Sequence, residues 1–207
     1  MRLVADNLGL ERGGRRLFAG LNLAIRAGEA LVVSGPNGAG KSSLLRALAG
    51  LAPFSAGRAR LEDGAGGLTM AEQTHYLGHA DSLKSALTAR ENLSFWAALL
   101  GGSGLGAGLG VGEALGRLGL PHVADLPVGA LSAGQKRRVA LARLLVAARP
   151  LWLIDEPTTA LDAAAQDLFA VVMREHLSGG GLIVAATHAP LGLPSARTLR
   201  LAGAAPA

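Results

Sequence analysis

The segment of this sequence best suited to chemistry is a glycine-rich loop that ends in a lysine and two serines. It reads Gly35-Pro36-Asn37-Gly38-Ala39-Gly40-Lys41-Ser42-Ser43. Backbone N–H groups can surround the oxygens of a polyphosphate only where the chain curls tightly and carries no bulky side chain at the contacts. The spacing predicts a nucleoside triphosphate site, in which Lys41 reaches the β- and γ-phosphates and the Ser42 hydroxyl ligates Mg²⁺.

Two adjacent acids follow a second apolar segment. The run Leu-Trp-Leu-Ile at 151–154 leads directly into Asp155 and Glu156. Ligands bind at the carboxyl ends of the strands of a parallel sheet, so Asp155 is placed to hold the shell of Mg²⁺ and Glu156 to polarise an attacking water. Strands often end in aspartate, so these two acids alone are weak evidence for a metal site. Their occurrence together with the phosphate loop makes the evidence strong.

A third polar segment, Leu131-Ser132-Ala133-Gly134-Gln135, precedes a helix predicted over 135–147. Small residues at the start of a helix leave its N–H groups open to an anion. Serine is also a favoured N-cap that serves the helix alone. Taken by itself, this segment leaves both interpretations open.

The elements that position these residues alternate between strand and helix. Apolar runs at 30–34, 151–154 and 182–186 predict buried strands, and helices are predicted over 42–51, 113–118 and 163–177, the last with Asp162 as N-cap. A further helix begins at the capping box Thr88-Ala89-Arg90-Glu91 and ends in a glycine-rich connector over 101–112. Residues 2–26 predict an antiparallel hairpin around Gly13-Gly14. The pattern indicates an α/β protein with a parallel sheet.

Composition narrows the classes of partner. The chain has 207 residues, enough for one domain over 1–207, and a net charge of +5. Its basic residues are spread along the chain and only 3% of residues are aromatic, so we expect no nucleic-acid partner. The chain has no cysteine, which excludes disulfides and thiolate metal sites. We expect neither a secretory signal nor a membrane span, because the uncharged stretch over 93–112 turns glycine-rich halfway.

Together the motifs resemble the nucleotide-binding domain of ABC ATPases over nearly the whole chain. Leu131 to Gln135 resembles the family signature, with Ala133 where glycine is more usual, and Asp155 to Asp162 resembles the Walker B end running into the D-loop. Thr187-His188 resembles the switch histidine. The resemblance implies a P-loop NTPase core with a mostly parallel sheet flanked by helices, an N-terminal antiparallel β-subdomain, and a helical subdomain inserted at approximately 80–145.

The resemblance also implies how the site works. Two copies face each other head to tail, and Ser132, Gly134 and Gln135 of one copy bind the ATP held by the phosphate loop of the other. Glu156 is then the catalytic carboxylate and His188 contacts the γ-phosphate. A lone histidine after a strand is usually structural, so the function of His188 rests on the resemblance.

Two positions depart from the family pattern. Arg12 stands where an aromatic side chain usually stacks on adenine, although a guanidinium plane can also stack. His79 stands where the family has the glutamine of the Q-loop, and imidazole titrates near neutrality. Selection of adenine and the contact of residue 79 with the Mg²⁺ water are therefore expectations from the family alone.

The second departure points to one branch, the family of cytochrome c maturation (haem exporter) ATPases. The resemblance lies in Tyr76 to His79, Leu83-Lys84, Leu87 to Leu93 and Leu131 to Leu144. It implies a peripheral subunit on the cytoplasmic face of the bacterial inner membrane that works with integral-membrane subunits. Its ATP hydrolysis is tied to haem export or to release of a haem-loaded chaperone. The alternatives are the ATPase of another small ABC exporter, or a soluble ABC-type ATPase without membrane subunits.

Two smaller expectations concern haem and the membrane subunits. His75, His79 and His122 are the candidates for a haem ligand, but none lies in a CxxCH context, and we expect surface or loop histidines. By resemblance, the segment from Gln73 to Leu100 holds a groove for a helix of a membrane subunit. Its candidate lining residues are Leu83, Leu87, Phe95 and Trp96, the last two of which are equally suited to the core.

Overall fold

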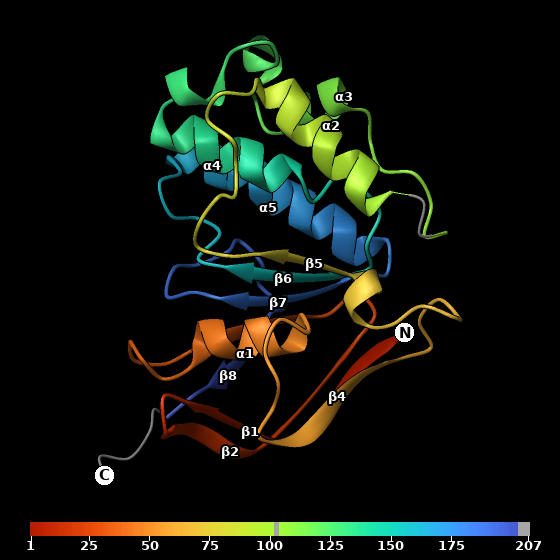
Figure 1. Ribbon diagram of the computed structural model, residues 1–207, viewed down its shortest axis with the longest axis vertical. Coiled ribbons are helices and arrows are strands. Elements are labelled where there is room, and N and C mark those ends of the chain that lie inside the picture. The colour runs from red at the N-terminus through yellow and green to blue at the C-terminus, as the bar shows by residue number, and fades with distance from the viewer. Residues whose placement is uncertain (102–103, 203–207) are drawn as a thin grey trace.

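The computed structural model describes residues 1–101 and 104–202, which form two sheets with helices between and above them (Figure 1). The five-stranded sheet is parallel and has the order β5-β6-β7-β3-β8. Its strands are β3 (Ala30–Ser34), β5 (Thr74–Leu77), β6 (Leu151–Asp155), β7 (Leu182–Ala186) and β8 (Arg197–Arg200). The predicted α/β class with a parallel sheet is confirmed.

The second sheet is antiparallel and has three strands in the order β2-β1-β4. The hairpin of β1 (Arg2–Arg12) and β2 (Arg15–Arg26) turns at Gly13-Gly14 as predicted, and β4 (Ala56–Glu62) pairs with the other side of β1. Neither β4 nor β8 is predicted by the sequence, because both are edge strands with charged residues and no apolar run.

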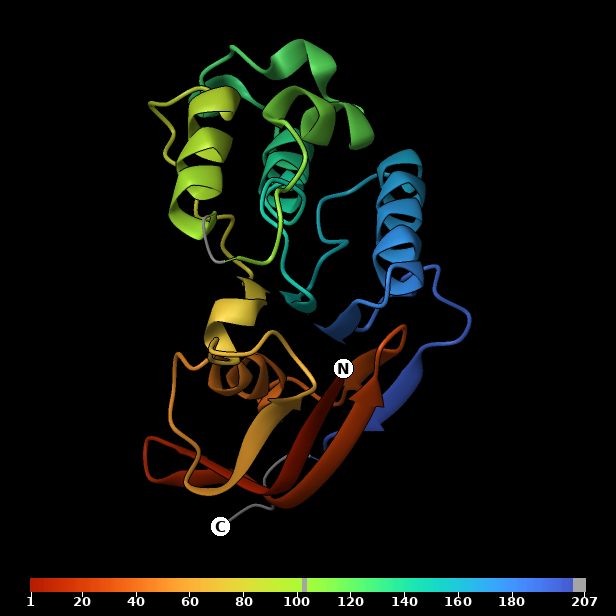
Figure 2. The ribbon, with the colours of Figure 1, turned by 90° about the vertical axis from the view of Figure 1, so that its right-hand side faces the viewer.

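Five helices complete the described part of the chain: α1 (Lys41–Leu48), α2 (Ala89–Leu100), α3 (Val111–Arg117), α4 (Ala133–Ala142) and α5 (Ala163–Ser178). Short 3₁₀ turns lie at Ala71–Gln73, Pro121–Val123 and Val128–Ala130. The capping box at Thr88 and Glu91 starts α2, and the Asp162 side chain caps α5, both as predicted. Figure 2 shows α2, α3 and α4 at the end of the molecule farthest from the antiparallel sheet.

The last residues of α1 and α4 and the connector differ most from the prediction, and α3 and α4 each begin two residues earlier than predicted. The first helix stops at Leu48 rather than Leu51, since the chain turns at Gly50, and Leu51 is 65% exposed. Helix α4 stops at Ala142 rather than Ala147, and the chain continues in turns. Residues 102–103 of the predicted connector lie outside the described residues; farther along it, Ala107 pairs with Ala147 in an isolated bridge.

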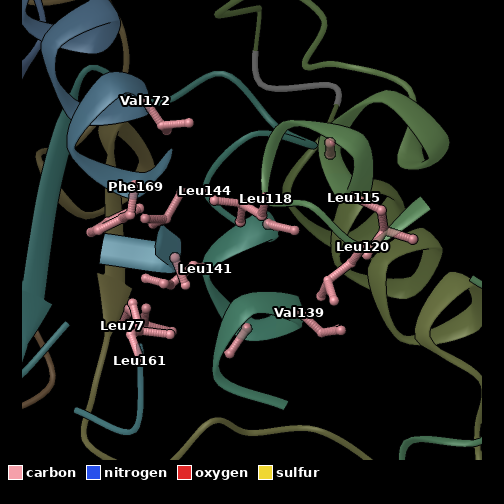
Figure 3. Packing of buried hydrophobic residues seen from close by; sticks show 14 of the residues in the cluster. Leu77, Leu115, Leu118, Leu120, Val139, Leu141, Leu144, Leu161, Phe169 and Val172 are labelled. Carbon is pink, nitrogen blue, oxygen red and sulfur yellow. The ribbon is translucent and has the colours of Figure 1, made fainter. Parts of the chain in front are cut away.

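The parallel sheet separates two hydrophobic cores. Along β6, Trp152 and Ile154 join a cluster with α4 and α5, whereas Leu151 and Leu153 join a cluster with α1 and the antiparallel sheet. Alternate residues of a strand point to opposite faces, so a strand that is apolar throughout serves both cores. Figure 3 shows the first cluster, in which Phe169 of α5 and Leu141 of α4 point into the space between the helices. Packing in these two cores holds β6 and β7 in place, and the polar residues Asp155, Glu156, Thr187 and His188 lie at the ends of these strands.

Candidate active site

The phosphate loop joins β3 to α1 in a backbone conformation that requires glycine at two points. Gly35 has a φ of 138° and Gly40 a φ of 98°, both in the region that side chains avoid. A Cβ added to Gly35 would collide with the carbonyl oxygen of Leu201, and one added to Gly40 would lie 3.1 Å from the Cβ of Leu17. Gly40 is also the N-cap of α1 and offers no capping side chain, so the first N–H groups of the helix stay available to an anion.

Lys41 lies buried in the curl of this loop. Its Nζ donates to the carbonyl oxygens of Gly35, at 2.8 Å, and Pro36, at 3.2 Å. It also lies 2.9 Å from Nε2 of His188. An ammonium has three protons and no lone pair, so it donates all three and the His188 nitrogen accepts. His188 and Lys41, 147 residues apart in sequence, are thus in direct contact.

Most of the predicted site residues line one cavity of about 520 Å³ at the carboxyl edge of the parallel sheet. The phosphate loop and α1 contribute one wall of this cavity, and β6 contributes the two acids. Of the predicted residues, the lining includes Arg12, Asn37, Gly38, Gly40, Lys41, Ser42, Ser43, His79, Asp155 and Glu156. Gly35, Pro36, Ala39 and His188 are not part of this lining: Ala39 is buried, and His188 lines a separate cavity with Thr187.

The two acids at the end of β6 have different surroundings. Asp155 is buried, at 5% exposure, and is the last residue of the strand. Glu156 is half-buried and has a φ of 46°, which is uncommon for a residue with a side chain. Its N–H donates to the carbonyl of Ala186, and its Oε2 accepts a hydrogen bond of 3.0 Å from the Thr187 hydroxyl. The end of β7 therefore fixes the direction of the Glu156 carboxylate.

The predicted signature residues are not in this cavity. Ser132 caps α4: its Oγ accepts from the N–H of Gln135 at 3.2 Å, and the Gln135 side chain accepts from the N–H of Ser132 at 2.9 Å. Gly134 lies close to the D-loop, where an added Cβ would be 2.9 Å from the carbonyl oxygen of Ala160. The capping interpretation of Ser132 is thus correct as far as one copy of the chain is concerned.

Of the three candidate haem histidines, only His75 differs from the expectation of surface or loop positions. His75 is buried on β5, where its Nε2 donates to the carbonyl of Ala147 at 2.8 Å and burial lowers its pKa to about 3. Burial likewise lowers the pKa of His176 to about 4, and its ring stacks on Trp152 at 3.8 Å. His122 and His79 are exposed, as expected. Across residues 1–101 and 104–202 no three His, Cys, Asp or Glu residues gather as a metal site would require.

Comparison with known proteins decides the family. The model of the ABC transporter family matches residues 18–159. The cytochrome c biogenesis ATP-binding export protein CcmA of Nitrobacter winogradskyi is 55% identical over 99% of this chain and 100% of that protein. The CcmA proteins of Bradyrhizobium diazoefficiens and Rhizobium meliloti are 56% and 53% identical, each over at least 98% of this chain and 99% of its relative. The chain is an ABC transporter ATPase of the CcmA family.

Solved ABC ATPases share the fold. An ABC transporter ATP-binding protein from Pyrococcus furiosus superposes with a TM-score of 0.80 at 20% identity, over 97% of this chain and 98% of that one. An ATP-binding cassette solved as a dimer in a post-hydrolysis state with ADP and Pi gives a TM-score of 0.81 at 24% identity, over 97% and 94% of the two chains. These likenesses confirm the predicted ABC ATPase fold.

Sequence reasoning missed two polar contacts of this ABC ATPase site. Thr187 was noted only as the neighbour of His188, although its place at the end of an apolar strand is the same signal that singled out Asp155. The second missed residue is Arg137, a buried arginine of α4 that contacts the end of β6. No local pattern points to it, because its partners come from segments 18 to 59 residues away.

Proposed function

We propose that this chain binds ATP with Mg²⁺ in the cavity at the carboxyl edge of the parallel sheet and hydrolyses it for a cytochrome c maturation complex. Residues 1–207 then act as one ABC ATPase domain, with its helical subdomain at approximately 80–145. The observation that carries the proposal is the shared cavity, which brings the phosphate loop, Asp155 and Glu156 to one place. A triphosphate hydrolase needs these three parts together.

The phosphate loop and Arg12 bind the nucleotide. The N–H groups from Gly35 to Ser43 and the start of α1 surround the phosphates, and the Lys41 ammonium exchanges part of its carbonyl bonds for phosphate oxygens. Arg12, exposed at the end of β1 and lining the cavity, stacks its guanidinium plane on the base.

The acids and Ser42 suit Mg²⁺ and a water nucleophile. Mg²⁺ prefers oxygen ligands and keeps several waters, so one carboxylate and one hydroxyl beside a triphosphate are sufficient. Asp155 and Ser42, which both line the cavity, supply that pair. When bound, the ion neutralises charge on the β- and γ-phosphates. Glu156 orients and polarises the attacking water, His188 contacts the γ-phosphate, and His79 takes the position of the Q-loop glutamine.

A second copy of the chain completes the site. Ser132, Gly134 and Gln135 start α4 outside their own cavity, and Ser132 is exposed. In a head-to-tail pair this helix start lies over the γ-phosphate of the other copy, where N–H groups and the Ser132 hydroxyl stabilise its charge. The dimeric ATP-binding cassette among the similar solved structures supports this arrangement.

Integral-membrane subunits are the second class of partner. No helix in the described ranges has both the length and the apolar character needed to cross a membrane. On α2 and the loop before it, Leu83 and Leu87 are half-buried and Phe95 is 49% exposed, so they are available to line a groove for a membrane subunit. Trp96 is half-buried against the Arg143 guanidinium and belongs partly to the core. The chain then works at the cytoplasmic face of the bacterial inner membrane as a peripheral subunit, and meets the haem-chaperone pathway only through its partners.

Deletion of the gene in the source organism tests this function. We expect loss of c-type cytochromes, restored by the wild-type gene and not by the E156Q variant. Normal cytochromes in the deletion strain would remove the assignment to cytochrome c maturation, whereas rescue by E156Q would remove the requirement for hydrolysis.

A further inference from the structure

Arg137, in the first turns of α4, binds the turn that carries the catalytic acid. Its side chain is only 4% exposed. Its Nη2 donates to the carbonyl oxygens of Asp155, at 2.9 Å, and Glu156, at 2.8 Å. Its Nε lies 3.4 Å from the carbonyl oxygen of Pro157. One guanidinium therefore contacts three successive carbonyls at the end of β6.

The other arm of the same guanidinium reaches the loop that carries His79. Its Nη1 donates to the carbonyl of Gly78, at 3.3 Å, and to the Asp81 carboxylate, at 2.8 Å. These two residues flank the position of the expected Q-loop glutamine. A planar fork with five N–H donors suits such a set of fixed acceptors, which the single point charge of lysine does not.

The backbone at Glu156 explains why this turn needs a clamp. Its φ of 46° is a conformation that a residue with a side chain keeps only where the surroundings over-determine it. On one side the N–H of Glu156 is bonded to the carbonyl of Ala186, and on the other side Arg137 holds the carbonyls around it. In this conformation the carboxylate accepts a hydrogen bond of 3.0 Å from the Thr187 hydroxyl.

We propose that Arg137 is a positioning residue that aims the Glu156 carboxylate and ties its turn to the His79 loop and to α4. The inference rests on the proposed role of Glu156 in ATP hydrolysis. Because Ser132 is the N-cap of α4, a shift of this helix as it closes on the ATP of the second copy is passed through Arg137 to Glu156. Each site thereby adjusts its catalytic carboxylate to the nucleotide bound in the other.

Steady-state kinetics of the full-length R137Q and R137K variants test the proposal, with R143Q as the matched control. Arg143 is also a buried arginine at the other end of α4; it donates to the carbonyl of Tyr76, at 2.7 Å, and stacks on Trp96. We expect kcat to fall at least about tenfold in both Arg137 variants with the KM for ATP within about twofold of wild type, and R143Q to keep kcat within about twofold. An R137Q variant with the kcat of R143Q, or one that changes KM and not kcat, overturns the proposal.

Two further measurements keep the test decisive. D81N removes one partner of Arg137 from a partly exposed position and leaves the fold; we expect a kcat about threefold lower at constant KM, and unchanged kcat contradicts the proposal. Hydrogen exchange of the peptide covering residues 155–161 requires no activity. It should be faster in R137Q and unchanged in R143Q, and equal exchange in both overturns the clamp. If wild-type protein does not hydrolyse ATP, the proposed function is wrong. Hydrogen exchange of residues 155–161 still tests whether Arg137 holds the turn at Glu156.

Discussion

The two edges of the parallel sheet both carry histidines, but the hydrogen bonds of those histidines run in opposite directions. At the carboxyl edge, His188 Nε2 lies 2.9 Å from the Lys41 ammonium and accepts a hydrogen bond from it. At the amino edge, Nε2 of His75 and of His176 lie 2.8 and 3.1 Å from carbonyl oxygens, which only accept, so these nitrogens donate. The same residue type is therefore held in different tautomers by the two edges.

Exposure separates the two edges further. His188 is exposed and lines a cavity together with Thr187, whereas burial lowers the pKa of His75 to about 3 and that of His176 to about 4. A histidine that stays neutral and donates to a backbone carbonyl serves the fold. The polar residues at strand ends therefore differ by edge: those at the carboxyl edge line cavities, whereas His75 and His176 at the amino edge donate to backbone carbonyls.

The largest expected effect that distinguishes the edges comes from the acid at the carboxyl edge. E156Q keeps the shape of the side chain and its bond from Thr187 but loses the charge that we propose polarises the attacking water. We expect kcat to fall about 10²- to 10³-fold while ATP affinity stays within about threefold, measured by phosphate release and equilibrium binding. E175Q makes the same change in an exposed carboxylate near the amino edge, paired with Arg117, and should leave kcat unchanged. Near-normal turnover in E156Q would assign catalysis to another group.

The amino edge should dominate the loss of stability in acid. The unfolded chain protonates His75 near its ordinary pKa of 6.5, but the folded chain does so only near 3. Between these values the unfolded state binds more protons, so stability falls as pH falls from 6.5 towards 3. At pH 4.5 the His75 contribution to this loss is about 2–3 kcal/mol. Urea unfolding at pH 7 and pH 4.5 measures it, and H75Q should show a smaller difference between the two pH values than wild type. An identical difference in H75Q contradicts this account.

Substituting one histidine at each edge tests directly whether the two edges differ in function. H188Q removes the ring that contacts Lys41, so we expect kcat to fall about 10- to 30-fold with the free energy of unfolding within about 0.5 kcal/mol of wild type. H75Q disturbs a buried hydrogen bond and should cost about 1–3 kcal/mol of stability, with the kcat of the folded protein within about twofold. If both variants lose turnover equally, the division of the edges by function is wrong.

The buried strands and the residues of the cavity can be predicted from the sequence, whereas the edge strands and the helix ends cannot. The apolar strands at 30–34, 151–154 and 182–186 are predictable because burial on both faces leaves an uninterrupted apolar run. The residues of the cavity are predictable because phosphate binding needs glycine, lysine and serine at fixed spacing. By contrast, β4 and β8 are edge strands that can be recognised only from their pairing with a neighbouring strand. Helices α1 and α4 end before the last leucines at helical spacing, because the chain turns there.

Tertiary contacts decide the remaining cases. Nothing in the sequence distinguishes His75, buried beneath the helices, from His79, which lines the cavity four residues later. Arg137 and Arg143 lie near opposite ends of the same helix, α4, and only the fold shows that one binds the turn at Glu156 and the other the Tyr76 carbonyl. Both distinctions depend on segments far apart in sequence, which spacing does not encode.

The smallest effect concerns Ser132, which tests whether the carboxyl edge works alone or needs a second copy. Ser132 and Thr88 form the same capping box on α4 and α2, so S132A and T88A should each lower the free energy of unfolding by about 1 kcal/mol. Only Ser132 is proposed to reach the ATP of another copy. We therefore expect a further loss of kcat in S132A, about three- to tenfold relative to T88A, with ATP affinity of the isolated chain unchanged. Equal kcat in the two variants would make Ser132 a cap and nothing more, and the cavity at the carboxyl edge would then be the whole site.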